Sequence, residues 1–140
     1  MREINKIIIH CSATRECQDI STETIRGWHV NERGWSDIGY HYIILIDGTI
    51  DEGRALEIQG AHVRGLNKNS IGICYVGGCD SKMNPKDTRT PEQIKSMNQL
   101  VSKLKEKYNA SVHGHNEFSS KACPAFNVKK EYNGNRKVQR

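Results

Sequence analysis

Two uninterrupted apolar runs constrain the fold of this chain more than any other feature of its sequence. Residues 6–10 place three consecutive isoleucines before His10, and residues 70–76 form a second run that Gly77-Gly78 ends. Extended segments of this kind are buried on both faces, as the inner strands of α/β proteins are. The two runs therefore predict two buried strands of a sheet, and the first of them delivers His10 at its end.

Two helices are predicted around these strands. Ser21 suits an N-cap, and the helix that follows should end near Arg33 because Gly34 offers a stop. Thr90-Pro91-Glu92-Gln93 combines a capping residue, a proline at the first helical position and a capping-box glutamine. Apolar residues then recur along one stripe as far as Tyr108, which predicts a long amphipathic helix.

Three shorter segments complete the predicted sheet. Residues 40–46 and 49–51 flank Asp47-Gly48, a pair that favours a type I′ hairpin turn. Residues 110–115 return as a strand, in which alternation would place His113 and His115 on the same face. Because strands and helices interleave, we predict an α/β protein, a single domain with a central mixed β-sheet flanked by helices.

Length and hydropathy favour one domain and no membrane span. A chain of 140 residues has the commonest domain size, and 36% hydrophobic with 26% charged residues is an ordinary globular composition. The longest aliphatic run, 43–46, is far too short to cross a bilayer. Only three consecutive apolar residues precede His10, whereas the apolar part of a secretory signal needs about 7–15. We therefore expect no export signal.

Cysteine usage favours a reducing compartment. Five cysteines, an odd number, occupy positions 11, 17, 74, 79 and 123 without the dense framework of a small secreted domain. Bridges between Cys11 and Cys17 or between Cys74 and Cys79 stay open, because sequence gives no distances. We expect Cys123 to bind a metal rather than to form a disulfide.

His10, His115 and Cys123 together could hold one zinc ion. Two imidazoles and a thiolate are donors that zinc accepts, and three protein ligands leave one position for water, as in catalytic sites. Spacing alone does not select them, because His10 and His115 lie 115 − 10 = 105 residues apart without a local metal motif. A lone histidine near a strand end is more often structural. The surrounding motifs therefore decide whether these residues are interpreted as metal ligands.

Six separated motifs, which together span about residues 7–128, surround these candidates. They are IIHCSAT at 8–14, IRGWH at 25–29, DIGYHY at 37–42, GAH at 60–62, NSIGI at 69–73 and KACP at 121–124. Together they resemble the zinc-dependent type 2 N-acetylmuramoyl-L-alanine amidases, whose fold is shared by small phage amidase lysozymes and peptidoglycan recognition proteins. The resemblance implies that His10, His115 and Cys123 are the zinc ligands.

The same resemblance implies catalytic roles for Tyr40 and Lys121. Lys121 would present a cation or hydrogen-bond donor to a developing oxyanion, and Tyr40 would orient the attacking water or the substrate oxygen. Alone, Lys121 would be an ordinary surface lysine and Tyr40 a packed strand tyrosine. His62 belongs to a loop that faces the substrate groove in the family. The predicted substrate contacts are His62, Arg64, Asn67 and Asn69.

Two further histidines receive other interpretations. His29 is expected to be a packing residue of the first helix. His113 is expected to be a neighbour of the metal ligands or an outer partner that supports one of them.

The function that the resemblance implies is a zinc hydrolase, with one Zn²⁺ per chain, that cleaves the amide between N-acetylmuramic acid and L-alanine in peptidoglycan. Without an export signal it would be made in the cytoplasm and act on the wall after release or lysis, as a phage or prophage endolysin, and we expect a monomer. The alternative is a non-catalytic peptidoglycan-binding recognition module. Such modules typically lack the cysteine ligand, so Cys123 favours the enzyme.

Positive charge is concentrated at the C-terminal end. Residues 121–140 hold six basic residues and one acid, which accounts for the whole net charge of +5. We divide the chain into an amidase domain at 1–132 and a basic, flexible tail at 133–140. Such a tail favours contact with a polyanion, for which we prefer anionic wall polymer to nucleic acid. The alternative is a solvated end.

Overall fold

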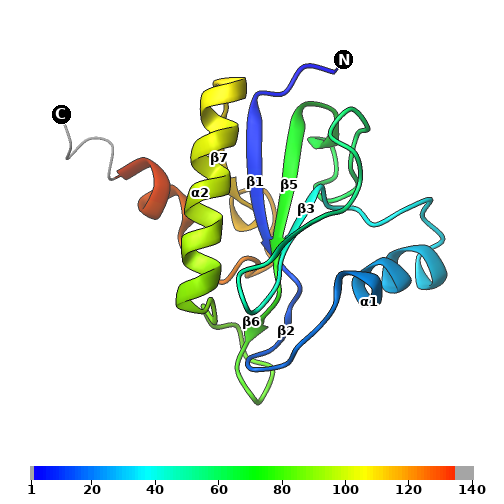
Figure 1. The fold of residues 1–140 in the computed structure, drawn as a ribbon, viewed down its shortest axis with the longest axis vertical. Helices are drawn as coiled ribbons and strands as arrows, with labels where there is room; N and C mark the ends of the chain where they lie inside the picture. Colours follow the sequence, from blue (N-terminus) through cyan, green and yellow to red (C-terminus); the bar gives the residue numbers. More distant parts are fainter. Residues whose placement is uncertain (1, 135–140) are drawn as a thin grey trace.

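Five strands form the central sheet in the order β4-β3-β5-β1-β7 (Figure 1). The computed structural model describes residues 2–134. The strands are β1 (Lys6–Cys11), β3 (Tyr42–Ile44), β4 (Ile50–Glu52), β5 (Ser70–Tyr75) and β7 (Ser111–Gly114). β1 pairs in parallel with β5 and β7, β3 pairs in parallel with β5, and β4 runs antiparallel to β3. The sheet is therefore mixed, as predicted.

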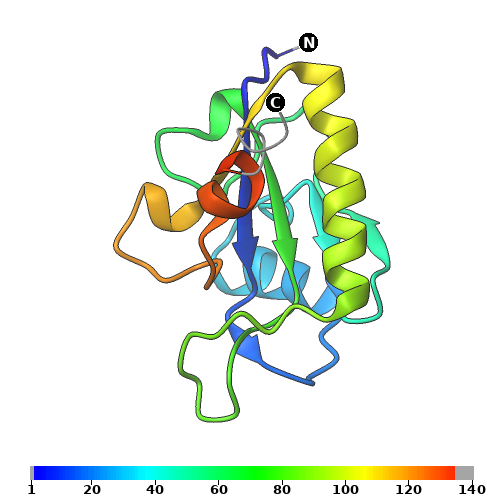
Figure 2. The ribbon, with the colours of Figure 1, turned by 90° about the vertical axis from the view of Figure 1, so that its left-hand side faces the viewer.

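One face of the sheet is covered by α2 (Pro91–Tyr108), which runs alongside the strands (Figure 2). The predicted capping box is present, with the Gln93 N–H donating to Thr90 Oγ1 at 3.1 Å and the Thr90 N–H to Gln93 Oε1 at 2.9 Å. Apolar side chains of the helix meet alternate residues of the strands. This core includes Ile7, Ile9, Ile44, Ile71, Ile73, Tyr75, Met97, Leu100, Val101, Leu104 and Val112.

The other face of the sheet carries the alternate residues of the same strands. Because successive side chains of a strand point to opposite faces, Ile8 and His10 point away from α2. The helix α1 (Thr22–Gly27) and the π-helical turn η1 (Trp28–Glu32) lie on this side (Figures 1 and 2). Ile25 packs there against Ile38 and Ile43 in a second, smaller core.

The first helix begins as predicted but does not keep its α-helical winding. Ser21 Oγ accepts a hydrogen bond from the Thr24 N–H at 3.1 Å, which confirms the N-cap. From Trp28 to Glu32 the chain is π-helical, before Gly34 reverses it with a φ of 74°. π-helical turns add a residue to the turn and often occur at functional sites.

The hairpin between β3 and β4 corrects the predicted type I′ turn. Gly48 has a φ of 91°, whereas Asp47 does not lie in the left-handed region. The Leu45 N–H donates to the Thr49 carbonyl at 2.8 Å, which closes a three-residue loop. Asp47 Oδ1 accepts from the Thr49 N–H at 2.9 Å, a side-chain bond that stabilises ordinary turn geometry. The hairpin itself is confirmed, but its turn type was wrong and its first strand spans Tyr42–Ile44 rather than residues 40–46.

Small elements complete the chain. β2 (Thr14–Arg15) and β6 (Gly78–Cys79) form a second, two-stranded parallel sheet, and η2 (Asn67–Asn69) precedes β5. The last predicted strand ends at Gly114, because His115 begins the 3-10 turn η3 (His115–Glu117). A final π-helical turn, η4 (Lys130–Gly134), extends past the predicted domain boundary at 132. Positions 135–140 of the predicted tail lie outside the described residues.

All five cysteines are free thiols, so neither of the two bridges left open by the sequence is formed. Within residues 2–134, no helix has both the length and the apolar character that a membrane span requires.

Candidate functional site

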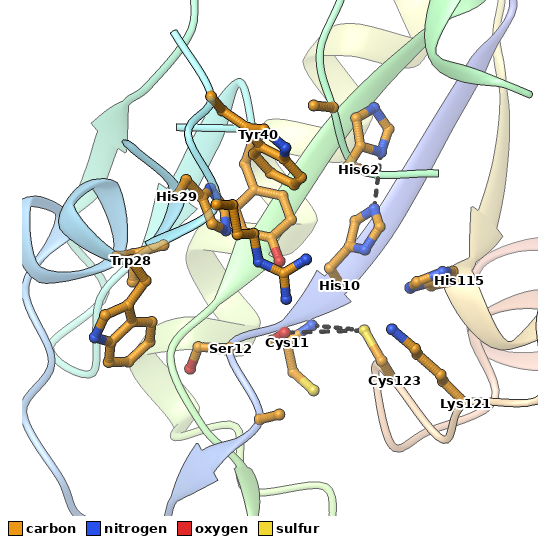
Figure 3. A pocket seen from close by; sticks show the side chains of 15 residues that line it. His10, Cys11, Ser12, Trp28, His29, Tyr40, His62, His115, Lys121 and Cys123 are labelled. Carbon is orange, nitrogen blue, oxygen red and sulfur yellow. Dashed lines mark hydrogen bonds between the residues drawn. The ribbon is translucent and has the colours of Figure 1, made fainter. Parts of the chain in front are cut away.

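A cavity of about 260 Å³ lies at the carboxyl end of β1, on the face opposite α2 (Figure 3). The carboxyl ends of parallel strands are the usual ligand-binding edge of an α/β sheet. The side chains predicted to bind metal or to act in catalysis all line this cavity: His10, Tyr40, His115, Lys121 and Cys123. The fold thus gathers residues from separate parts of the sequence into one place.

Strand pairing explains why the two predicted histidine ligands meet. β1 and β7 are parallel with Ile9 opposite Gly114, so the next residues, His10 and His115, follow side by side. Their ring centroids are 4.8 Å apart. One donor atom from each histidine and the Cys123 sulfur lie within 4.8 Å of one another. This set of two nitrogens and one sulfur could hold a metal ion.

The local environment suits both kinds of donor. Desolvation, then the neighbouring His62 and His115, lowers the pKa of His10 well below its usual value. Desolvation, then the Lys121 charge, lowers the pKa of His115. Both rings are therefore neutral near pH 7, the form in which imidazole binds metals. The Cys123 sulfur accepts a hydrogen bond from the Cys11 N–H at 3.2 Å, a contact that helps to hold it beside the two rings.

Tyr40 and Lys121 flank the donor set on different sides (Figure 3). The Tyr40 ring is tilted against that of His10, with centroids 5.1 Å apart. Desolvation, followed by the neighbouring cysteines, raises the pKa of Tyr40 well above its usual value, so its hydroxyl keeps its proton at neutral pH. Lys121 is exposed, and its amine points toward the space between His115 and Cys123.

His62 makes a contact that the sequence did not suggest. Its Nδ1 lies 2.8 Å from His10 Nε2, so it touches a predicted metal ligand as well as facing the groove. Its loop is fixed by Asn67, whose Oδ1 accepts the N–H groups of His62 and Val63, both at 2.9 Å. Desolvation, then the neighbouring His41, lowers the pKa of His62 to about 3, so this ring is also neutral near pH 7.

A groove of about 460 Å³ continues from the cavity and contains three of the four predicted substrate contacts. Its lining includes Arg33, Trp35, His62, Arg64, Asn67, Phe118 and Lys121. The fourth, Asn69, lines neither space. Its amide donates to the Glu3 carbonyl at 2.8 Å and so holds the N-terminal segment instead.

Four residues from η1 and the segment after it also line the cavity, although no role in the site was predicted for them: Trp28, His29, Arg33 and Trp35. His29 does pack as expected, with Nδ1 accepting from the Gly39 N–H at 2.8 Å and its ring 4.7 Å from that of Trp35. The Arg33 guanidinium lies 5.3 Å from the centre of the Trp35 ring. Two tryptophans in an otherwise polar segment were the available signal, because partly exposed tryptophan often marks a binding surface.

His113 does not support the metal ligands. Its two ring nitrogens are engaged by Ser111 Oγ at 2.7 Å and by Glu117 Oε1 at 2.9 Å, and it does not line the cavity. The expected outer-partner role is therefore wrong, because both hydrogen-bonding positions are used elsewhere.

Comparison with known proteins identifies the family. Residues 1–126 match the family model described as N-acetylmuramoyl-L-alanine amidase. The chain belongs to this amidase family. It is 42% identical over 138 residues to the endolysin of Klebsiella phage KP32, covering 98% of this chain and 91% of the relative. It is 44% identical over 133 residues to the endolysin of Escherichia phage T7, covering 94% of this chain and 87% of the relative.

A solved amidase has the same fold. The N-acetylmuramoyl-L-alanine amidase LysC from Clostridium intestinale superposes with a TM-score of 0.80 at 29% identity, covering 98% of this chain and 87% of that one. The predicted fold class and the predicted enzyme class are both confirmed. The chain is an N-acetylmuramoyl-L-alanine amidase that cleaves peptidoglycan.

Proposed function

We propose that this amidase is a zinc-dependent endolysin that hydrolyses the bond between the lactyl group of N-acetylmuramic acid and L-alanine. The observation that carries the proposal is the convergence of His10, His115 and Cys123 in one cavity with Tyr40 and Lys121. The alternative, a module that binds without cutting, needs neither a complete donor set nor polar groups beside it.

The donor chemistry fits zinc. Neutral imidazoles and a thiolate are its common protein ligands, and a set of three is typical of catalytic rather than structural sites. When bound, zinc supplies a Lewis acid that polarises a carbonyl and brings the pKa of water down to about 7. The Cys11 N–H, which donates to the Cys123 sulfur at 3.2 Å, helps to hold that sulfur where it can bind the ion.

Lys121 and Tyr40 act on the scissile group in this proposal. The Lys121 amine, directed toward the donor set, donates a hydrogen bond to the oxygen that gains negative charge as the carbonyl is attacked. Tyr40 keeps its proton because of burial, so its hydroxyl donates to a substrate oxygen or holds the attacking water in line.

The groove beside the cavity holds the remainder of the substrate in this proposal. His62, Arg64 and Asn67 offer polar groups along it, and Trp35 and Phe118 offer flat apolar surfaces. A glycopeptide presents both hydroxyl or amide groups and apolar ring faces, so a groove of mixed character suits it. Asn69 is left out because its amide already bonds the Glu3 carbonyl.

The endolysin role rests on the relatives. The chain spans 91% and 87% of the two phage endolysins, so the likeness covers almost their whole length. By this role the protein acts on the bacterial wall after release from the cell in which it is made, and peptidoglycan is its partner.

Digestion of purified peptidoglycan, with and without a strong zinc chelator, tests the proposal. Mass spectrometry should find intact stem peptides with a free L-alanine amine, together with glycan chains that keep their lactyl groups. Chelator should abolish both products, and added zinc should restore them. Binding to peptidoglycan without release of peptides would favour the recognition module, and chelator-resistant release would overturn the zinc assignment.

A further inference from the structure

His62 is the middle member of a chain of hydrogen bonds that starts at a metal ligand. Its Nδ1 lies 2.8 Å from His10 Nε2, and its Nε2 lies 3.3 Å from Ser70 Oγ. Ser70 Oγ in turn lies 2.7 Å from the Leu66 carbonyl oxygen. The chain therefore runs from His10 through His62 and Ser70 to a backbone carbonyl, which is its fixed end.

The fixed end determines where every proton lies. A carbonyl oxygen only accepts, so the single hydroxyl proton of Ser70 goes to Leu66. Ser70 Oγ must then accept from His62, which places the one proton of that neutral ring on Nε2. His62 Nδ1 is left as an acceptor, and the proton between the two rings belongs to His10 Nε2.

We propose that His62 and Ser70 are positioning residues that hold His10 in the tautomer with its proton on Nε2, so that the Nδ1 lone pair is the one offered to the metal. The inference rests on the proposed function, because it concerns the zinc site. Figure 3 shows the consequence in space, since His62 and the pair His115 and Cys123 lie on different sides of the His10 ring.

The packing around His62 is shaped for this contact. Ser70 and His10, the two residues whose side chains contact the His62 ring, are 0% and 1% exposed, so water does not compete for either contact. A Cβ on Gly72 would lie 2.7 Å from His62 Cγ, and one on Gly60 would lie 2.9 Å from His62 Cδ2. The ring therefore lies flat against β5 because position 72 has no side chain, and any larger residue there would displace it.

The arrangement accounts for a second, half-buried histidine beside a ligand. A carboxylate in this place would add a negative charge and a larger desolvation cost, whereas a neutral imidazole accepts from His10 without either. An outer partner of this kind typically contributes about 10–100-fold to metal affinity.

Zinc affinity of matched variants tests the inference. Zinc-loaded full-length protein is titrated with a chromophoric chelator of known affinity, for the parent, His62→Leu, His62→Asn and Ser70→Ala. His62→Leu should weaken zinc binding about 10–100-fold. His62→Asn should recover most of that loss, because its side-chain oxygen can accept from His10 as Nδ1 does. Ser70→Ala should give a smaller loss of zinc affinity. His62 then still contacts His10, but Ser70 no longer determines which nitrogen of the His62 ring carries the proton.

Nitrogen-15 NMR of the imidazoles supplies a readout that general loosening of the fold would not imitate. In the zinc-loaded parent, the His10 proton should be found on Nε2 and that of His62 also on Nε2. A His10 proton on Nδ1, or equal zinc affinity in the parent and His62→Leu, would overturn the inference while leaving the zinc site intact. A parent that binds no zinc at all would instead remove the proposed function, and the inference with it.

Discussion

At the scale of single residues, the site depends on hydrogen bonds by which neighbouring residues hold one another in place. Cys11 ends β1 directly after His10, one of the proposed metal donors, and its backbone N–H donates to another, the Cys123 sulfur, at 3.2 Å. Tyr75, on the neighbouring strand, donates from its hydroxyl to the Pro124 carbonyl at 2.7 Å and so holds the residue after that cysteine. Contacts from two strands therefore help to place the sulfur, together with the turn of its own loop that the Ala125 N–H closes by donating to the Ala122 carbonyl at 2.7 Å.

Loss of one donor should remove the metal. The protein should bind about one zinc per chain, and Cys123→Ser or His115→Ala should weaken binding by more than the roughly 100-fold that an outer partner contributes. The exposed Cys17 provides the control, because Cys17→Ser makes the same change outside the cavity. Metal analysis after gel filtration measures the stoichiometry. Full zinc content in both site variants would contradict the ligand set.

Substitution of Lys121 should lower the turnover of the enzyme without lowering its zinc content. Lys121→Ala should keep its zinc and lose about 10²-fold or more in turnover, as removal of one oxyanion donor does in other hydrolases. Lys82→Ala, a change of an exposed lysine on a distant loop, should keep the parent rate. Release of stem peptides from native peptidoglycan is the assay. A parallel loss of zinc would show that Lys121 is structural, and an unchanged rate would exclude it from the mechanism.

At the scale of elements, α2 is tied to the sheet by one buried amide. Gln93 is 0% exposed, and its Nε2 donates to the Ile44 and Val76 carbonyls at 3.2 and 3.0 Å. These two carbonyls lie where β3 and β5 end. The capping glutamine of the helix thus also completes the hydrogen bonding of the sheet.

Gln93→Leu should therefore cost more than loss of a helix cap. It leaves the Val76 carbonyl without that donor, while the Ile44 carbonyl still accepts from the Val76 N–H, and it removes the capping-box bond from the Thr90 N–H as well. The free energy of unfolding should fall by about 2 kcal/mol, because a buried unsatisfied group costs about 1–3 kcal/mol. The exposed Gln99 on the same helix is the matched control, and Gln99→Leu should change stability by less than about 0.5 kcal/mol. Urea unfolding measures both. Equal stability of the two variants would show that the buried amide is dispensable.

Elements whose signals are local and redundant were predictable from sequence. The capping box sets the start of α2. The runs of β1 and β5 are apolar on both faces, so burial of both strands could be predicted. The turn at Asp47-Gly48 was not predictable, because a single side-chain bond to the Thr49 N–H decides its geometry. The π-helical winding of η1 has no periodic signal, so its contribution to the cavity wall was missed.

The candidate site likewise has parts that could be predicted from the sequence and parts that could not. Its donor and catalytic residues were inferred from resemblance to a family, since no local spacing connects His10 with His115. Their meeting follows from the parallel pairing of β1 with β7, which the sequence pattern does not specify. The contact between His10 and His62 depends on the missing side chain at Gly72, a steric fact that appears only once the strands are assembled.

At the scale of the whole molecule, charge is distributed unevenly along the chain. The net charge of +5 resides in residues 121–140, and Arg136, Lys137 and Arg140 supply three of the six basic residues there. Deleting 135–140 should weaken binding to intact sacculi at low salt and leave cleavage of a small soluble muropeptide unchanged, because attraction between opposite charges acts at long range and is screened by salt.

A salt series in a sacculus sedimentation assay measures the effect of this deletion. The difference between the two proteins should vanish at high salt. Equal binding at every salt concentration would show that the basic end is only solvated, and reduced cleavage of the soluble muropeptide would show that these residues belong to the packed domain.

The central position of β1 also has a consequence for synthesis. β1 is synthesised before β7, the strand with which it pairs, and the proposed partner donors of His10 lie at positions 115 and 123. A nascent chain that has not yet left the ribosome beyond residue 114 carries one donor of the three. We therefore expect fragments of the chain that end before residue 115 to lack wall-degrading activity.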